Sequence, residues 1–449
     1  MLHIPTKLIE RYNRQNGLII VSSYPEKGHT YSGHVGGIAS FTKNTATSIP
    51  NKPVIVLAEA LTHEEVYEEQ AVLVIRAWRR NDPKLWLTLL GIIKTFSNVP
   101  RVLVEYDFAL YGNIATSGLV VGFLALLRTL RKEVSILLHS VVTDTKPLAG
   151  HLGLDEYDLD IAKIHAFNAV FATFYRLIGI ASHRVIVTEE VLAETLSRFM
   201  PRQQISVIPH GIDTTLKSVP KDTAKRLLGI DPTETVVMQF GFINQYKGTD
   251  FFVKTFQDCR SLLGVRTHFI LAGGQSATLN DKAYYQRFYS RISRDVDNAK
   301  SIKITGFVRQ EDIPLYYSAA DLIVFPYKAF ICASGPLSMV FSYQKPFIVS
   351  KQLVSAFGAS DLKQALTDCD LTDKDISFGL TPTSLRDRAE KVLRNGLKQK
   401  MITMAGIIRT KRSWKEIGML YEDILWQPKV AFALRMLRTF LPVPAYAKR

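Results

Sequence analysis

Short apolar runs alternate along most of the chain with longer segments of helical periodicity. The strands predicted from these runs are Leu18–Ser22, Val54–Ala58, Ala71–Ile75, Arg101–Tyr106, Val134–Ser140, Arg184–Thr188 and Ile205–Pro209 in the first half, and Val236–Gly241, His268–Gly274, Ile302–Val308, Asp321–Tyr327 and Pro346–Ser350 in the second. Nearly all-apolar strands that alternate with helices predict parallel sheets covered on both faces. A chain of 449 residues is long for one core and suits two such units.

Two segments between the predicted strands are polar enough to be interpreted as connections. Glu64–Gln70 is charged, and Asp144–Phe167 is interpreted as an irregular, mobile loop over a cleft. The second segment contains Asp158-Leu-Asp160, a D-x-D pattern of the metal-binding kind. The same pattern recurs at Asp295 and Asp368, so its signal is weak.

The segment 236–256 has the pattern of an anion-binding turn. An apolar run ends at Gly241, a polar turn leads to Lys247-Gly248, and a helical pattern follows with Thr249 available as its cap. Free backbone N–H groups at a helix start, together with a lysine, favour a phosphate group. The alternative is an ordinary strand-to-helix turn whose lysine is solvated.

Five motifs in order carry a resemblance to a known family: IPHGID, FGFINQYKG, FILAGG, ITGFVRQEDIPLYYSAADLIVFPY and SGPLSMVFSYQKPFIVS. They resemble the nucleotide-sugar-binding half of retaining GT-B glycosyltransferases. The similarity is greatest to the group 1, family 4-like set that includes sucrose synthases and bacterial mannosyltransferases. This resemblance implies an α/β fold of GT-B architecture, in which two Rossmann-like domains with parallel sheets face a central cleft. The domains expected are an acceptor-side domain over 1–213, a nucleotide-sugar-binding domain over 214–413, and helices over 414–449 that return to the first domain.

The resemblance also assigns roles to individual residues. It implies that His139, at the end of a predicted strand, lies near the anomeric carbon of the sugar, although a lone histidine is more often structural. Lys247 is expected to neutralise the leaving diphosphate, and these two residues are the predicted catalytic pair. The predicted donor-binding residues are Gly36, Gly37, Gly241, Phe307, Val308, Ser334, Gly335, Pro336 and Leu337. For Gly36-Gly37 the alternative is a flexible surface loop. Glu105 and Asp107 end a predicted strand, where the family often has an acidic residue near the acceptor side, but they are interpreted as plain loop residues.

The chain departs from the family pattern at two places. The arginine that the family carries after the glycine of the phosphate turn is replaced by Phe242 or Ile243, and its two glutamates fall at Ile331 and Met339. The turn Ala333-Ser334-Gly335 before a predicted helix is the expected substitute for the missing carboxylate grip. The identity of the donor is therefore left open.

Charge and composition narrow the choice of partners. The net charge of +15 favours an anionic partner, but no helix-turn-helix, zinc-finger or RNA-binding signature accompanies it, so nucleic acid is not expected. Three cysteines without metal-ligand spacing suit a reducing cytoplasm. No N-terminal signal is visible and the longest apolar run, Gly118–Leu127, is too short to span a bilayer, so an integral membrane protein is not expected. The basic tail Lys429–Arg449 is predicted either to lie on a membrane surface or to pack on the first domain.

The sequence therefore predicts a retaining, metal-independent hexosyltransferase without a cofactor. It would move a sugar from a GDP- or UDP-sugar to a glycan or lipid-linked acceptor, in the cytoplasm or on the inner face of the membrane. The alternative is a non-catalytic glycosyltransferase-like subunit that binds a partner or a glycan, which the missing glutamates favour.

Overall fold

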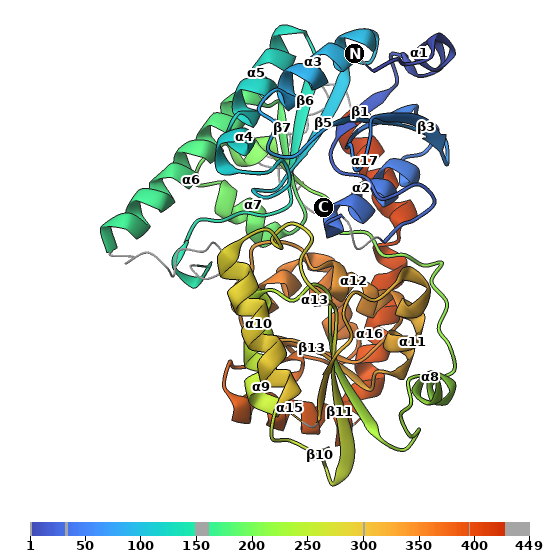
Figure 1. Cartoon of the computed structure of the whole chain (residues 1–449), viewed down its shortest axis with the longest axis vertical. Coiled ribbons are helices and arrows are strands. Elements are labelled where there is room, and N and C mark those ends of the chain that lie inside the picture. Colours follow the sequence, from blue (N-terminus) through green and yellow to red (C-terminus); the bar gives the residue numbers. More distant parts are fainter. Residues whose placement is uncertain (1, 32–34, 149–160, 300, 395, 427–449) are drawn as a thin grey trace, which may run out of the picture.

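The computed structural model describes residues 2–31, 35–148, 161–299, 301–394 and 396–426. Its two sheets lie one beyond the other along the longest axis of the molecule, each with helices on both faces (Figure 1). The predicted α/β fold with two parallel-dominated sheets is confirmed.

The first sheet has eight strands in the order β3-β4-β2-β1-β5-β6-β7-β8. Their bounds are β1 Leu18–Val21, β2 Val54–Glu59, β3 Glu65–Glu69, β4 Val72–Trp78, β5 Arg101–Tyr106, β6 Glu133–Leu138, β7 Arg184–Val187 and β8 Ile205–Val207. All neighbours pair in parallel except β3, which runs antiparallel to β4. The interpretation of Glu64–Gln70 as a connection was therefore wrong. Its charged residues form an edge strand, where exposed charges discourage pairing with other chains.

The second sheet follows the order β10-β11-β9-β13-β14-β15, and β12 pairs with β11. Its strands are β9 Thr235–Phe240, β10 Ser261–Leu262, β11 Val265–Ala272, β12 Ile302–Ile304, β13 Leu322–Phe325, β14 Phe347–Ser350 and β15 Ser377–Phe378. Only the pairing of β10 with β11 is antiparallel among the recorded pairs. The carboxyl ends of β9, β11 and β13 lead into the glycine-rich turns predicted from the sequence.

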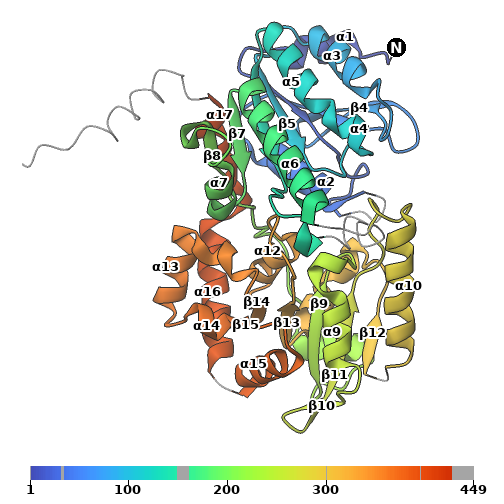
Figure 2. The same cartoon turned by 90° about the vertical axis from the view of Figure 1, so that its left-hand side faces the viewer.

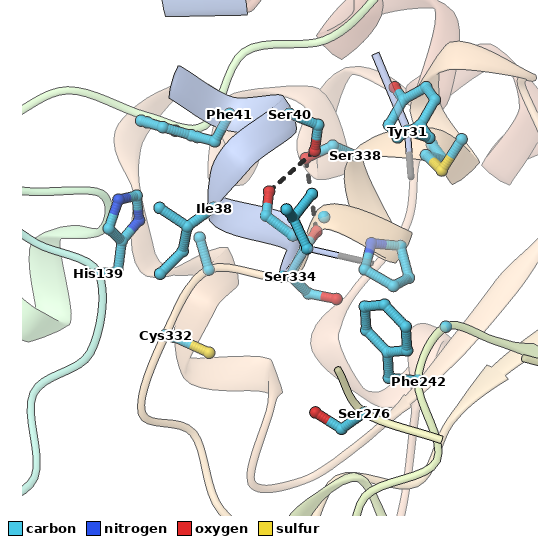
Figure 3. Close-up of a pocket in the computed structure, with 18 of the residues that line it drawn as sticks. Tyr31, Ile38, Ser40, Phe41, His139, Phe242, Ser276, Cys332, Ser334 and Ser338 are labelled. Carbon is cyan, nitrogen blue, oxygen red and sulfur yellow. Dashed lines mark hydrogen bonds between the residues drawn. The ribbon is translucent and has the colours of Figure 1, made fainter. Parts of the chain in front are cut away.

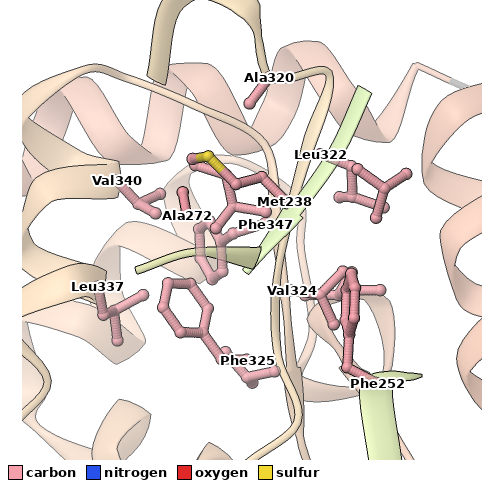
Figure 4. Close-up of a cluster of buried hydrophobic side chains, with 14 of the residues drawn as sticks. Met238, Phe252, Ala272, Ala320, Leu322, Val324, Phe325, Leu337, Val340 and Phe347 are labelled. Atoms are coloured by element: carbon pink, nitrogen blue, oxygen red, sulfur yellow. The ribbon is translucent and has the colours of Figure 1, made fainter. Parts of the chain in front are cut away.

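Side chains from both faces of the second sheet form a continuous core (Figure 4). Met238 and Val324 belong to strands, whereas Phe252 and Val340 reach the core from helices, and all four are at most 1% exposed. Full burial of such a side chain contributes roughly 1.5–3 kcal/mol. This core fixes the strand ends that carry the turns.

Helices cover the sheets and make up most of the remaining described chain. The helices are α1 Thr6–Tyr12, α2 Gly37–Ser48, α3 Leu85–Thr95, α4 Ile114–Gly118, α5 Val120–Thr129, α6 Ile161–Ala181, α7 Glu190–Leu196, α8 Lys221–Leu227, α9 Thr249–Phe256, α10 Ala283–Asp297, α11 Ile313–Ala319, α12 Gly335–Ser342, α13 Ser360–Asp368, α14 Asp373–Ile376, α15 Pro382–Arg394, α16 Leu397–Lys411 and α17 Trp414–Trp426. The loop predicted to extend to Phe167 was wrong from residue 161 onward, because α6 begins there. Asp158 and Asp160 lie outside the described residues.

One described helix, α6, is long and apolar enough to cross a membrane, judged by length and composition alone. It is nevertheless packed on the first sheet. The Tyr175 hydroxyl of α6 accepts a hydrogen bond from the Val142 amide at 2.8 Å and donates one to the Val142 carbonyl at 3.1 Å.

The chain passes between the two halves twice, and the two passages lie side by side. Ile212 donates its N–H to the Arg412 carbonyl at 2.7 Å, and the Trp414 N–H returns to the Ile212 carbonyl at 3.2 Å. After the second passage, α17 packs against α2 of the first half. The close contact of Gly418 with the Ser48 carbonyl leaves no space for a side chain there. The domain boundaries at 213 and 413 remain predictions, and the tail Lys429–Arg449 lies outside the described residues.

Candidate active site

A cavity of about 360 Å³ lies between the two halves and draws its walls from both (Figure 3). Of the predicted site residues it brings together His139, Lys247, Gly36, Gly37, Gly241, Phe307, Val308, Ser334, Gly335 and Pro336. Leu337 does not line this cavity. It is 7% exposed and borders a much smaller void behind α12.

The predicted anion-binding turn has a compact geometry. Gly241 and Gly248 have φ values of 108° and 70°, a region that favours glycine. A Cβ on Gly248 would overlap the Pro326 carbonyl, and one on Gly241 would lie 3.3 Å from the Lys247 Nζ. The lysine ammonium therefore lies against Gly241, the residue that follows β9. Thr249 was predicted to cap α9, but Gly248 holds the cap position and no side chain caps the helix.

The ammonium of Lys247 lacks an anionic neighbour. The residue is 8% exposed, and no hydrogen bond or ion pair joins its Nζ to any residue that the structure describes. Burial lowers the pKa of this group to about 8. A buried ammonium that faces a cavity without a counter-ion is suited to receive an anion.

The N-terminus of α12 forms a second wall. The Ser334 hydroxyl accepts a hydrogen bond from the Leu337 N–H at 3.3 Å and lies 2.9 Å from the Tyr327 hydroxyl. This geometry makes Ser334 a helix cap, so its hydroxyl is already engaged. Pro336 has no N–H, and the Gly335 N–H has no hydrogen-bond acceptor recorded among the described residues. A Cβ on Gly335 would meet nothing closer than the His210 Nε2 at 3.9 Å, so the approach to this amide is open.

The His139 ring contacts the buried carboxylate of Glu105, a residue interpreted from the sequence as part of a loop. Its Nε2 lies 3.0 Å from the Glu105 Oε2, which also accepts hydrogen bonds from Ser22 at 3.0 Å and Thr42 at 2.8 Å. Glu105 is 0% exposed on β5, so the interpretation as a loop residue was wrong. The carboxylate fixes a proton on Nε2 and turns the other ring nitrogen away from it.

The first half contributes further polar groups that the sequence analysis did not single out as site residues. Burial raises the pKa of Glu59 to about 7, against the opposing effect of Arg80 and Arg76. Arg80 donates to the Ala109 carbonyl at 2.8 Å, while its buried Nε has no partner within the described chain. Both residues line the cavity with Asp107. Neither follows a recognisable motif, so only the fold reveals them.

His210 is another residue that the sequence analysis passed over. It belongs to the IPHGID motif, which was interpreted only as the crossover between domains. Its Nδ1 lies 2.9 Å from the Ser338 hydroxyl of α12, and burial lowers its pKa to about 4. The ring is therefore neutral at physiological pH.

The two departures from the family pattern are visible at the cavity. Phe242 lines the wall where an arginine was expected, and its ring stacks with Phe307 at a centroid distance of 6.3 Å. Met339 also lines the cavity, whereas the Ile331 carbonyl accepts a hydrogen bond from Val141 across the cleft at 2.9 Å. The acidic residues of the described walls are Glu59, Asp107 and Asp213.

Comparison with known proteins finds similarity in both sequence and fold. Residues 234–357, which include the phosphate turn and the start of α12, match the family model of glycosyl transferases group 1. The lipopolysaccharide core biosynthesis mannosyltransferase LpsB of Rhizobium meliloti is 36% identical over 126 residues, which are 27% of this chain and 33% of that relative. The chain thus matches about a third of the length of that curated relative.

Solved structures extend the likeness to both halves. The sucrose-phosphate synthase of Thermosynechococcus elongatus superposes with a TM-score of 0.66 at 16% identity, over 94% of this chain and 99% of that one. The Anabaena HepE protein in complex with UDP and glucose gives a TM-score of 0.61 at 15% identity, over 92% and 99%. At such identities the likeness concerns the fold. The segment 234–357 is similar to glycosyl transferases of group 1, and the chain as a whole has the GT-B fold.

Proposed function

We propose that this protein is a glycosyltransferase that moves a sugar from a nucleotide-sugar donor to an acceptor hydroxyl. The observation that carries the proposal is the buried ammonium of Lys247. It faces the cavity with no acidic side chain paired to it among the described residues, beside Gly241 and the open N-terminus of α12. A diphosphate at this place would receive a charge-assisted contact from the lysine and a hydrogen bond from the Gly335 amide.

The second half holds the nucleotide in this proposal. Phe307 is 42% exposed, and together with Phe242 it offers an aromatic surface for the base. Val308 lines the same part of the wall. The Lys247 ammonium and the helix dipole of α12 then stabilise the negative charge that develops on the diphosphate as the glycosidic bond breaks. Catalysis of this kind needs no protein nucleophile.

The first half receives the sugar and the acceptor. His139, oriented by Glu105, is placed to contact the sugar, and the Gly36-Gly37 start of α2 admits close approach because no Cβ stands there. Glu59, Arg80 and Asp107 supply polar contacts for acceptor hydroxyls. A glycan or lipid-linked acceptor in polysaccharide or glycoconjugate assembly, on the cytoplasmic side of a membrane, fits the basic charge of the chain.

Retention of configuration and independence from metal are further parts of the proposal, and each has its own test. Proton NMR of the first-formed product reports the anomeric configuration directly. Activity in the presence of EDTA should equal that in its absence, because Lys247 and α12 supply the positive potential. Loss of activity on chelation that manganese restores would contradict metal independence.

A ligand screen tests the proposal itself. The melting temperature should rise with UDP or GDP and with the matching nucleotide sugars, since a ligand at about 100 times its Kd adds roughly 2.7 kcal/mol to the free energy of unfolding. AMP and free glucose serve as controls. If no nucleoside diphosphate shifts the melting temperature, the donor site does not exist and the proposal fails.

One observation favours a second candidate, a non-catalytic subunit that binds a partner or a glycan. Neither Ile331 nor Met339 is acidic, although the family pattern has glutamates at both places. The two candidates differ in one outcome. A nucleotide sugar that binds without being hydrolysed or transferred in the presence of any glycan acceptor would support the subunit.

A further inference from the structure

The outer surface of the first half is formed by α3, α4, α5 and α6, with α5 packed against both α3 and α6. Figure 2 looks onto this surface, which we call the α3–α6 face. Thirteen large hydrophobic side chains are exposed among the described residues, and eight of them lie on this face. They include Leu87, Ile114, Leu126, Val170, Leu177 and Ile180. Such a concentration of exposed apolar side chains marks an interaction surface.

The helix α6 shows the pattern most clearly. Val170, Leu177 and Ile180 are 65%, 44% and 71% exposed and follow one stripe of the helix, while Tyr175 and Ile178 on the opposite side are buried. Only 17% of the residues in Ile164–Ala181 are buried. A helix on the surface of a soluble protein normally exposes a mainly polar side, whereas α6 carries large apolar side chains on its exposed side as well as on its buried side. Because Tyr175 bonds α6 to Val142 in the segment that follows β6, the helix lies along the surface of the protein.

Charge distinguishes among the partners that could cover this face. The sequences of α3, α4, α5 and α6 contain no aspartate or glutamate. Lys94, Arg128 and Arg176 are exposed on these helices, and the exposed Arg131 follows α5. A two-fold contact between copies of the chain would bring two cationic surfaces together, which is unfavourable. An apolar surface whose helices carry cations and no acidic residue matches the headgroup region of an anionic bilayer.

We propose that the α3–α6 face docks on an anionic membrane surface, with α6 lying in the plane of the interface. The apolar stripe enters the boundary between headgroups and acyl chains, and the lysine and arginine side chains contact the phosphate groups around it. This proposal uses no residue of the cavity, so it stands or falls separately from the proposed enzymatic activity.

The test is co-sedimentation of the full chain with phosphatidylcholine vesicles that contain or lack phosphatidylglycerol. The wild type should bind the anionic vesicles at least tenfold more tightly than the neutral ones, with weaker binding at high salt. The double variant Val170→Glu/Ile180→Glu should lose at least tenfold in affinity for anionic vesicles. Leu227→Glu on α8 is the matched control, because Leu227 is also 65% exposed but lies in the second half.

Further measurements keep the outcome interpretable. All variants should melt within a few degrees of the wild type, since the changed side chains are exposed. Lys94→Gln/Arg176→Gln should weaken binding and flatten its salt dependence without affecting the melting temperature.

Three results would overturn the proposal. The wild type could fail to bind anionic vesicles, or the Val170→Glu/Ile180→Glu variant could bind as the wild type does, which would assign binding to another part of the chain. Light scattering could instead show a wild-type dimer that this variant dissociates, which would make the face a contact between copies.

Discussion

At the scale of single residues, Lys247 combines burial, a cavity-facing ammonium and the absence of a counter-ion among the described residues. Replacement of Lys247 by Ala should lower kcat/KM for the donor by about ten- to a hundredfold, because a charge-assisted contact contributes roughly 1.5–3 kcal/mol. Lys254→Ala on the exposed side of α9 is the control. Steady-state kinetics with a verified donor measure both. Equal kinetics for Lys247→Ala and wild type would remove Lys247 from the site.

The depressed pKa of Lys247 gives a pH dependence of known sign. Its folded-state value of about 8 is below the ordinary 10.5, so this group disfavours folding below about pH 8, and the penalty disappears as pH rises toward 10.5. Anion binding has the opposite trend because it needs the charged form. The Kd of a nucleoside diphosphate should therefore increase above pH 8, by up to about tenfold per pH unit. Lys247→Arg should flatten this slope, since guanidinium stays charged. Calorimetric titration between pH 7 and 9.5 checks both, and equal slopes would contradict the assignment.

Glu105 acts on the site through another residue, because it contacts His139 and not the open cavity. Glu105→Gln should lower kcat about ten- to a hundredfold by releasing the histidine ring, while leaving the Kd for the nucleoside diphosphate unchanged. His139→Ala should have a similar effect, and the double variant should lose little more than either single variant. Independent, additive losses would mean that Glu105 serves only the stability of the fold.

At the scale of elements, the start of α12 leaves space for a side chain at Gly335, whereas the anion-binding turn at Gly241 and Gly248 does not. Gly335→Val should abolish nucleotide binding with little change in melting temperature, because a Cβ there meets only His210 at 3.9 Å. Met339→Leu on the same helix is the volume-conserving control and should be nearly silent. Thermal shift and calorimetry measure the two effects. Wild-type affinity in Gly335→Val would exclude the amide of α12 from the donor site.

The elements recovered from the sequence are those with the strongest hydrophobic signal. The strands β1, β9 and β13 are buried along most of their length, so their apolar runs define them. The edge strand β3 carries glutamates because one side faces solvent, and its pattern therefore resembles a loop. Helix α6 was misjudged at its start because the apolar and polar residues before Phe167 lack a clean stripe. The apolar residues on the exposed side of α6 form a hydrophobic pattern that normally indicates a buried helix face.

Only some residues of the candidate site could be predicted from the sequence, for a related reason. Glycines and a lysine at strand ends form local motifs, so Gly241, Lys247 and Gly335 could be assigned from the sequence. Glu105 could not, because its partners Ser22, which follows β1, and Thr42 of α2 are brought to it only by the order of the strands. The engagement of the Ser334 hydroxyl is equally a result of tertiary structure, since Tyr327 lies in the segment that follows β13.

At the scale of the whole molecule, Gln310 links the two halves outside the cavity. Its Oε1 accepts hydrogen bonds from the amides of Thr30 at 2.8 Å and Tyr31 at 2.9 Å. Gln310→Ala should favour separation of the halves and weaken the apparent donor affinity severalfold, because the binding-competent arrangement is less populated. Small-angle scattering should show a larger radius of gyration without ligand. Gln286→Ala, whose recorded bonds stay within the second half, is the control. An unchanged radius of gyration would show that this link does not hold the halves together.

The paired passages at Ile212 and Trp414 restrict how the two halves can move. A single connecting segment would let the two halves rotate relative to each other about any axis. Two adjacent connecting segments, joined by the bonds between Ile212, Arg412 and Trp414, act as a hinge with a single axis. Rotation of the halves about the hinge axis keeps these hydrogen bonds intact, whereas twisting or sliding of one half against the other would break them. If the proposed transfer requires the cavity to open and close, we expect the motion to follow this one axis, so that the groups on the two walls return to the same relative orientation.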